Sequence, residues 1–143
     1  MKCQSGFSFL EILIALVLVV VTGAGVYTLT ADIQAKQHNV RLAEGAMHLA
    51  SAQLAHWRLM NTGASCNGSK SGNIVLGSLA QCLINTEGTV YELDVSETKN
   101  ILSNSDGVYA KKLTLLVRWQ DSRARKQTMS FYFTGSTLRN QAP

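Results

Sequence analysis

The sequence opens with MKCQSG (residues 1–6) and continues with FSFLEILIALVLVVVTGAGVYTL (residues 7–29), and this stretch decides the fold. The basic Lys2 and the small Gly6 both precede the apolar run, whereas a secretory signal peptide has its small-residue cleavage site after that run. The nearest candidate for such a site is TGAG, well inside the run. Residues 12–29 approach the roughly 20 residues that cross a bilayer as a helix. The stretch therefore predicts a membrane anchor that stays attached to the protein.

Glu11 is the charged residue of this apolar segment. A carboxylate inside a membrane helix is costly, so it is usually protonated, paired or close to the interface. Residues four apart share a helix face, so Glu11 lies one turn beyond Phe7 on the same side. Cleavage between Gly6 and Phe7 would create a free amine at this depth, and the amine of a neighbouring copy could neutralise Glu11. A plain single-pass anchor with an incidental Glu11 is the alternative.

Residues 6–16, GFSFLEILIAL, resemble the class III signal of type IV pilins and type II secretion pseudopilins. The glycine, the aromatic residue, the glutamate and the apolar run all fall at the spacing of that motif. The resemblance implies cleavage after Gly6 by a prepilin peptidase, N-methylation of Phe7 and a role for Glu11 in aligning subunits during assembly. Major pilins often have a proline further along the helix, but the only proline here is Pro143, and two glycines supply the weak point instead.

The helical pattern continues beyond residue 29 and becomes amphipathic. Apolar residues recur at alternating spacings of three and four, which predicts one helix face packed against another element. These residues are Val40, Ala43, Met47, Ala50, Leu54 and Trp57. No proline interrupts residues 7–60 and Asn61-Thr62-Gly63 is a natural stop, so a helix about 80 Å long is expected. A domain this small cannot bury such a helix, so its first half must lie in lipid or among similar helices.

Three stretches of the C-terminal half alternate apolar and polar residues, as half-buried antiparallel strands do. They are residues 89–95, 112–119 and 127–133, with a polar hairpin loop at 121–126. One side of this sheet can cover the apolar helix face and close a small core. The predicted fold is an α+β pilin-like lollipop with a long N-terminal helix and a small antiparallel head. The expected segments are the leader peptide 1–6, the transmembrane and polymerisation helix 7–29, the amphipathic helix 30–60 and the periplasmic head 61–143.

Two of the three cysteines, Cys66 and Cys82, lie in the polar half of the chain. A short Gly/Ser-rich stretch separates them, which predicts a disulfide made in an oxidising compartment, with two unrelated buried thiols as the alternative. On the chain-entropy account, closing a loop of this length stabilises the fold by about 3 kcal/mol. His48 and His56 share a helix face but lack the third ligand of a zinc site, so no metal and no cofactor are expected.

The polar loop at 121–126 carries Arg123, Arg125 and Lys126, which form a candidate ligand patch for DNA or an acidic partner. A solvated loop that protects the hairpin from edge pairing is the alternative. The net charge of +4 is mild and its residues are scattered, so it specifies neither partner. The sequence shows no nucleophile motif, metal-ligand cluster or usable carboxylate pair, and the chain is not expected to be an enzyme.

Residues 117–121, VRWQD, carry a second resemblance, to PilV-type minor pilins and, second, to GspI-type minor pseudopilins. It implies a minor type IV pilin that takes part in pilus priming or in a tip complex. The alternatives are a minor pseudopilin of type II secretion, or a pilus-displayed DNA-binding or adhesion module. The implied partners are other minor pilins, the major pilin, the prepilin peptidase and the inner-membrane assembly platform. The implied location is the bacterial inner membrane, with one membrane pass and a periplasmic head, and then the surface fibre.

Overall fold

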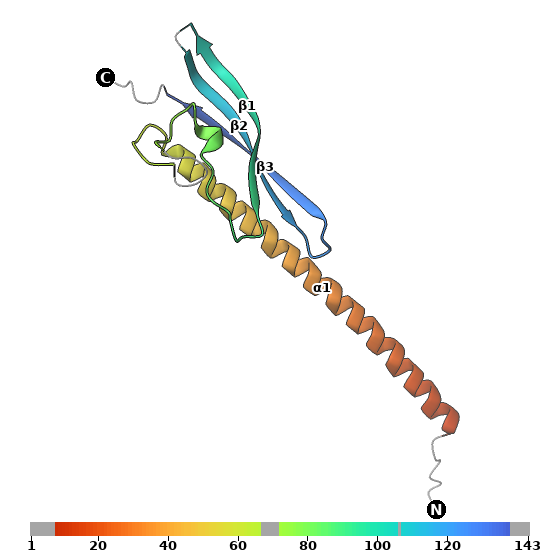
Figure 1. Cartoon of the computed structure of the whole chain (residues 1–143). Helices are drawn as coiled ribbons and strands as arrows, with labels where there is room; N and C mark the ends of the chain where they lie inside the picture. The colour runs from red at the N-terminus through yellow and green to blue at the C-terminus, as the bar shows by residue number, and fades with distance from the viewer. Residues whose placement is uncertain (1–7, 67–71, 106, 138–143) are drawn as a thin grey trace, which may run out of the picture. The chain divides into compact units, whose positions relative to one another are not determined.

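The computed structural model describes residues 8–66, 72–105 and 107–137. It has the predicted α+β composition, with one long helix and one three-stranded antiparallel sheet (Figure 1). The elements in chain order are α1 (Phe9–Arg58), the short 3-10 helix η1 (Leu79–Gln81), β1 (Glu92–Asn104), β2 (Gly107–Gln120) and β3 (Lys126–Ser136). Contacts divide the chain into two units, Met1–His38 and Asn39–Pro143.

The ends of α1 follow from local chemistry. At its start, the backbone N–H groups of Glu11 and Ile12 donate to the Ser8 carbonyl, at 2.9 and 3.3 Å. At its end, Asn61 adopts a left-handed conformation with φ of 62°, which asparagine tolerates better than most residues. The Asn61 N–H then donates to the Ile74 carbonyl at 3.0 Å, so the chain turns away from the helix axis. The predicted helix stop is confirmed to within two residues.

The sheet has the strand order β1-β2-β3, with Leu115 of β2 opposite Val95 of β1 and Phe131 of β3. β2 and β3 contain the two later predicted strands, and the predicted hairpin loop joins them. β1 differs more, because it begins three residues later than predicted and continues to Asn104. Its register shifts at three places after Val95. These shifts break the alternation of two that identifies a strand in a sequence, and so the second half of β1 was missed.

The core of the Asn39–Pro143 unit lies between the second half of α1 and one face of the sheet. The β2 side chains predicted to share a face are all buried there: Leu113, Leu115, Val117 and Trp119. From α1 the fully buried side chains are Ala46, Ala50, Gln53 and Trp57. The predicted apolar stripe was therefore wrong at two positions, since Val40 and Met47 are 56% and 52% exposed. Instead, an adjacent row of helix residues faces the core. The small side chains at positions 46 and 50 in this row allow close packing.

Gly45 has a specific packing role in this core. A Cβ atom at position 45 would collide with the Tyr91 hydroxyl and would lie 2.9 Å from the ring carbon Cζ. The Tyr91 hydroxyl donates a hydrogen bond to the Leu42 carbonyl at 2.9 Å, and the ring meets Trp119 edge-on at 6.5 Å between centroids. Glycine at position 45 thus lets the segment before β1 dock directly on the helix backbone.

Candidate assembly helix and head surfaces

The first part of α1 presents an uncovered apolar surface. Among the described residues, α1 is the helix that is long and apolar enough to cross a membrane, and none of its most apolar window is buried within the chain. Large apolar side chains on every side of it are exposed: Phe9, Leu10, Ile12, Leu13, Ile14, Leu16, Val17, Leu18, Val19, Val20, Val21, Val26, Tyr27 and Leu29. Apolar surface of this extent requires cover by lipid or by other helices.

Glu11 lies in the first turn of α1 with an exposed side chain. The N-terminus of a helix carries a partial positive charge, so a carboxylate is better placed there than in the middle of an apolar helix. Gly6 and Phe7, the predicted cleavage and methylation residues, lie outside the described residues. The predicted neutralisation of Glu11 by an amine and the two processing steps therefore remain predictions.

Hydroxyl groups in the apolar segment are satisfied by the helix itself. The Thr22 hydroxyl donates to the Leu18 carbonyl at 2.8 Å, and the Thr30 hydroxyl donates to the Val26 carbonyl at 2.8 Å. A hydroxyl bonded in this way enters an apolar medium at little cost. α1 is continuous through Gly23 and Gly25, where an added Cβ would meet nothing within 4 Å. These threonine hydroxyls are thus compatible with an apolar environment.

The β2–β3 loop is organised by Asp121, which is buried. Its carboxylate accepts hydrogen bonds from the backbone N–H groups of Arg123 and Arg125 at 2.9 Å each, and from the side chain of Gln127 at 3.2 Å. Arg125 Nε lies 3.0 Å from the same carboxylate. These hydrogen bonds, with the one from the Arg125 backbone first, hold the pKa of Asp121 below its ordinary value of 3.8, although burial acts in the opposite direction.

This arrangement changes the interpretation of the predicted ligand patch. Arg123 and Arg125 lie on the loop and Lys126 is the first residue of β3, and all three are exposed. However, the guanidinium of Arg125 is engaged with Asp121, so part of its charge is used within the loop. Sequence reasoning missed Asp121, although an aspartate that opens a polar turn often accepts hydrogen bonds from the following backbone N–H groups.

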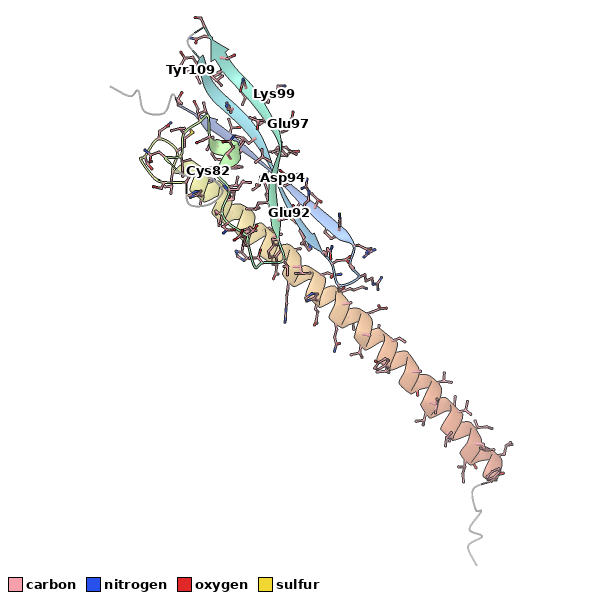
Figure 2. All side chains as sticks on the ribbon, viewed as in Figure 1. Cys82, Glu92, Asp94, Glu97, Lys99 and Tyr109 are labelled. Carbon is pink, nitrogen blue, oxygen red and sulfur yellow. A yellow bond between two sulfur atoms is a disulfide. The ribbon has the colours of Figure 1, made fainter. Side chains whose placement is uncertain are left out.

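Acidic side chains gather on β1, which is an edge strand of the sheet. Glu92, Asp94 and Glu97 project from this strand, as Figure 2 shows. Asp94 forms an ion pair with Arg118 of β2 at 3.0 Å. Charged side chains and register shifts both discourage unwanted strand pairing at a sheet edge. This edge is therefore suited to remain in solvent.

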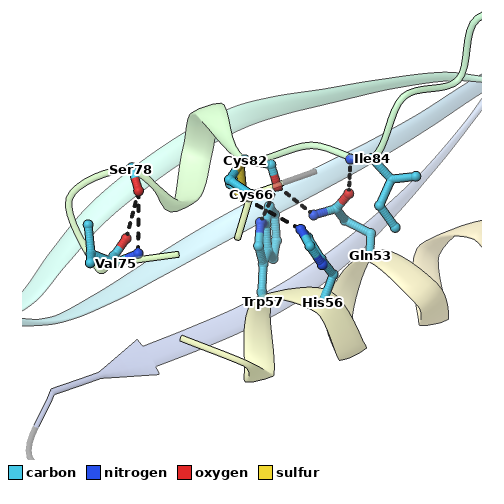
Figure 3. The surroundings of a disulfide bond; sticks show 8 residues. All are labelled: Gln53, His56, Trp57, Cys66, Val75, Ser78, Cys82 and Ile84. Atoms are coloured by element: carbon cyan, nitrogen blue, oxygen red, sulfur yellow. Dashed lines mark hydrogen bonds between the residues drawn. A yellow bond between two sulfur atoms is a disulfide. The ribbon is translucent and has the colours of Figure 1, made fainter. Parts of the chain in front are cut away.

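Cys66 and Cys82 form a disulfide with 5.4 Å between their Cα atoms (Figure 3). The Cys82 carbonyl accepts hydrogen bonds from the side chains of Gln53 and Trp57, at 2.9 Å each. The Gln53 side chain also accepts one from the Ile84 N–H at 2.7 Å. The disulfide-bearing segment is thus fastened to α1 by buried polar groups. Gln53 could not be identified from the sequence, because its partners are about thirty residues away.

His56 approaches this disulfide, with Nε2 3.6 Å from Cys82 Sγ. The possible ligand atoms of His56, Cys66 and Cys82 all lie within 4.8 Å of one another. The two sulfur atoms are bonded to each other in this state, so they do not provide the thiolates that a soft metal ion requires.

A groove of about 580 Å³ lies between the end of α1 and β3. Its walls include Leu54 and Trp57 from α1 and Tyr132 and Phe133 from β3. Among the described residues that line it, Arg58 is the only charged one.

Residues 1–27 match a protein family described as the prokaryotic N-terminal methylation motif. No curated protein and no solved structure gives a significant match to the chain. The motif indicates a type IV pilin-like or pseudopilin-like substrate of a prepilin peptidase, and proteins of this kind are structural rather than catalytic. Together with the apolar part of α1, it indicates membrane anchoring and assembly with other pilins.

Proposed function

We propose that the chain is a minor type IV pilin that takes part in pilus priming or in a tip complex. In this role a prepilin peptidase removes residues 1–6 and Phe7 becomes the methylated N-terminus. Before assembly the protein resides in the bacterial inner membrane as a single-pass protein with a periplasmic head. It then joins other minor pilins and the major pilin through the inner-membrane assembly platform. One observation carries the proposal: the methylation motif extends into an uncovered apolar helix that has a carboxylate in its first turn.

The exposed apolar side chains of α1 supply the polymerisation surface in this proposal. In the membrane they contact lipid, and in a fibre they contact the equivalent helices of neighbouring subunits. Lipid is as apolar as these side chains, so apolar contacts alone do not favour neighbouring subunits over lipid. Assembly therefore needs a polar interaction between subunits as well. Glu11 supplies it, because a carboxylate in an apolar surrounding gains by pairing with the N-terminal amine of the next subunit.

The decisive experiment counts surface fibres on a strain that lacks this gene, with the restored gene as the control. If the deletion strain loses its fibres and the restored gene brings them back, a priming role is supported. Normal fibre numbers contradict that role. Normal fibres together with a defect in the release of exported proteins favour the minor pseudopilin of type II secretion.

Glu11→Ala tests the polymerisation surface directly. We expect leader cleavage to remain, and co-purification with partner pilins to fall several-fold, because the pairing group is lost. Glu44→Ala is the matched control, since Glu44 is an exposed carboxylate on the same helix. Equal co-purification of the two variants would refute the role of Glu11.

A second candidate function is a pilus-displayed DNA-binding module, which the exposed Arg123, Arg125 and Lys126 support although the charge of Arg125 is partly engaged by Asp121. Replacement of Arg123, Arg125 and Lys126 by alanine would abolish DNA retention and leave fibre numbers unchanged. Wild-type DNA retention in the triple variant would eliminate this candidate.

A further inference from the structure

The two sulfur atoms of the disulfide have different surroundings. Cys82 is 0% exposed, and its backbone is held on both sides, by its N–H to the Leu79 carbonyl at 3.1 Å and by its carbonyl to the side chains of α1. Cys66 is 5% exposed and lies on the loop after α1, next to an isolated bridge between Ser65 and Asn73. Of the two buried residues, Cys66 is therefore the one that retains some exposed surface.

The second difference is the imidazole of His56, shown beside Cys82 in Figure 3. A disulfide sulfur carries no hydrogen, so in this 3.6 Å contact a hydrogen bond forms in the tautomer of His56 that is protonated at Nε2. A thiolate would accept the same hydrogen bond more strongly, because it carries a full negative charge. Within the described part of the chain, no hydrogen bond of this kind is seen at the Cys66 sulfur.

We propose that thiol–disulfide exchange in this head has one direction, in which Cys66 is attacked and Cys82 leaves as a thiolate stabilised by His56. An external thiolate forms a bond to Cys66 Sγ, the Cys66–Cys82 bond breaks, and its electron pair stays on Cys82 Sγ. His56 donates its hydrogen bond to that sulfur. A leaving thiol that is better stabilised as a thiolate leaves faster, so this direction is favoured over the opposite one.

The same geometry sets the order of events in disulfide formation. The Cys66 thiolate attacks one sulfur of a disulfide carrier, either an oxidised thiol oxidoreductase or a small disulfide such as oxidised glutathione. The carrier's own S–S bond breaks, its electron pair stays on the other carrier sulfur as a thiolate, and a mixed disulfide with Cys66 remains. The Cys82 thiolate then attacks Cys66 Sγ and expels the carrier as its thiolate. The protein loses two electrons and the carrier gains them. His56 acts here as a positioning residue for Cys82.

The test uses the full oxidised chain in detergent with Cys3→Ser, so that two cysteines remain. Reduced glutathione is added, the reaction is stopped with acid, and peptide mass spectrometry locates the glutathione adduct. We expect the adduct on Cys66 and the free thiol on Cys82. An adduct distributed equally, or found mainly on Cys82, would overturn the proposal.

His56→Leu tests the role of the imidazole, with the exposed His48→Leu on the same helix as the matched control. We expect His56→Leu to slow reduction by at least about threefold, and His48→Leu to leave the rate unchanged. A variant that only loosened the fold would expose the disulfide and speed up its reduction. An unchanged or faster rate in His56→Leu would therefore contradict the proposal.

A spectroscopic measurement makes the test independent of protein stability. In the reduced chain at neutral pH, thiolate absorbance in the ultraviolet should be lower in His56→Leu than in wild type. A chelator is included, because His56, Cys66 and Cys82 could bind a soft metal ion once the disulfide is reduced. Equal absorbance in the two proteins would show that His56 does not stabilise the thiolate. If His56→Leu fails to fold, the adduct position in the wild-type chain still decides the direction of exchange.

Discussion

Gly45→Ala should destabilise the head, although alanine is the better helix former. An alanine Cβ would collide with the Tyr91 hydroxyl and would lie 2.9 Å from Cζ and 3.3 Å from Cε2 of the same ring. The ring cannot remain where it is, because several of its atoms are involved and not just a flexible end. Tyr91 must move away from the helix, and the hydrogen bond of its hydroxyl to Leu42 is then lost.

The magnitude follows from four contributions. Replacing glycine by alanine within a helix gains about 1 kcal/mol. The lost hydrogen bond costs about 1 kcal/mol, and loss of the edge-on contact between Tyr91 and Trp119 costs about 1 kcal/mol more. Residual overpacking adds about 1 kcal/mol at the lower end of its range. The free energy of unfolding should fall by about 2 kcal/mol, which corresponds to a decrease of roughly 8 °C or more in the Tm of a domain of this size.

The assay is thermal unfolding of the full chain in detergent, followed by near-ultraviolet circular dichroism. Gly77→Ala is the matched control, because a Cβ at position 77 meets nothing within 4 Å and its φ is ordinary. In the Gly45→Ala background, Tyr91→Phe should cost less than it does alone, since the colliding hydroxyl is then gone. A Tm for Gly45→Ala at or above that of wild type would refute the reasoning.

Three further predictions concern the head. Gln53→Leu should lower the free energy of unfolding by about 2–3 kcal/mol, because the Ile84 N–H loses its acceptor inside the protein. In thermal unfolding, the control Gln37→Leu at an exposed position should have little effect, and equal effects of the two variants would contradict this. Replacing both Cys66 and Cys82 by serine should cost about 3 kcal/mol and make Tm insensitive to a reductant, whereas a wild-type Tm would contradict the stabilising role of the disulfide. Asp121→Asn should lower Tm at neutral pH, and the difference in Tm from wild type should shrink as pH falls below about 3.8. A carboxylate with a lowered pKa stabilises the fold above its unfolded pKa and loses that effect as it is protonated. A difference in Tm that is independent of pH would contradict this.

The parts of the fold that could be predicted are those where one local pattern dominates. β2 and β3 largely alternate, and the apolar side chains that were predicted to share one face of each strand are buried or half-buried in the core as expected. The second half of β1 could not be predicted, because its register shifts leave no regular alternation. The inward row of α1 was displaced at Val40 and Met47 because this helix has more apolar residues than one face can bury. The choice between adjacent rows depends on the sheet that packs against them.

The candidate sites divide in a similar way. Glu11 and the cysteine pair could be identified from sequence, since an isolated carboxylate and two spaced cysteines are local signals. Gln53 and His56 could not, because their importance comes from Cys82, which the fold brings from about 26 or more residues away. The ion pair between Arg125 and Asp121 joins residues four apart in the sequence. It was overlooked because the positive charges of the same loop suggested a ligand patch.

Two parts of one helix carry different energetic roles. Between Ala46 and Trp57 the inward side chains are buried within the chain, so substitutions there act on the stability of the head. In residues 9–29 the apolar side chains are exposed, and the chain itself offers them no cover. A polar substitution in that segment therefore has no packing within the head to disrupt. Its cost must appear in insertion into lipid or in association with other helices, and a variant with an unchanged head Tm but impaired assembly is what the proposed function requires.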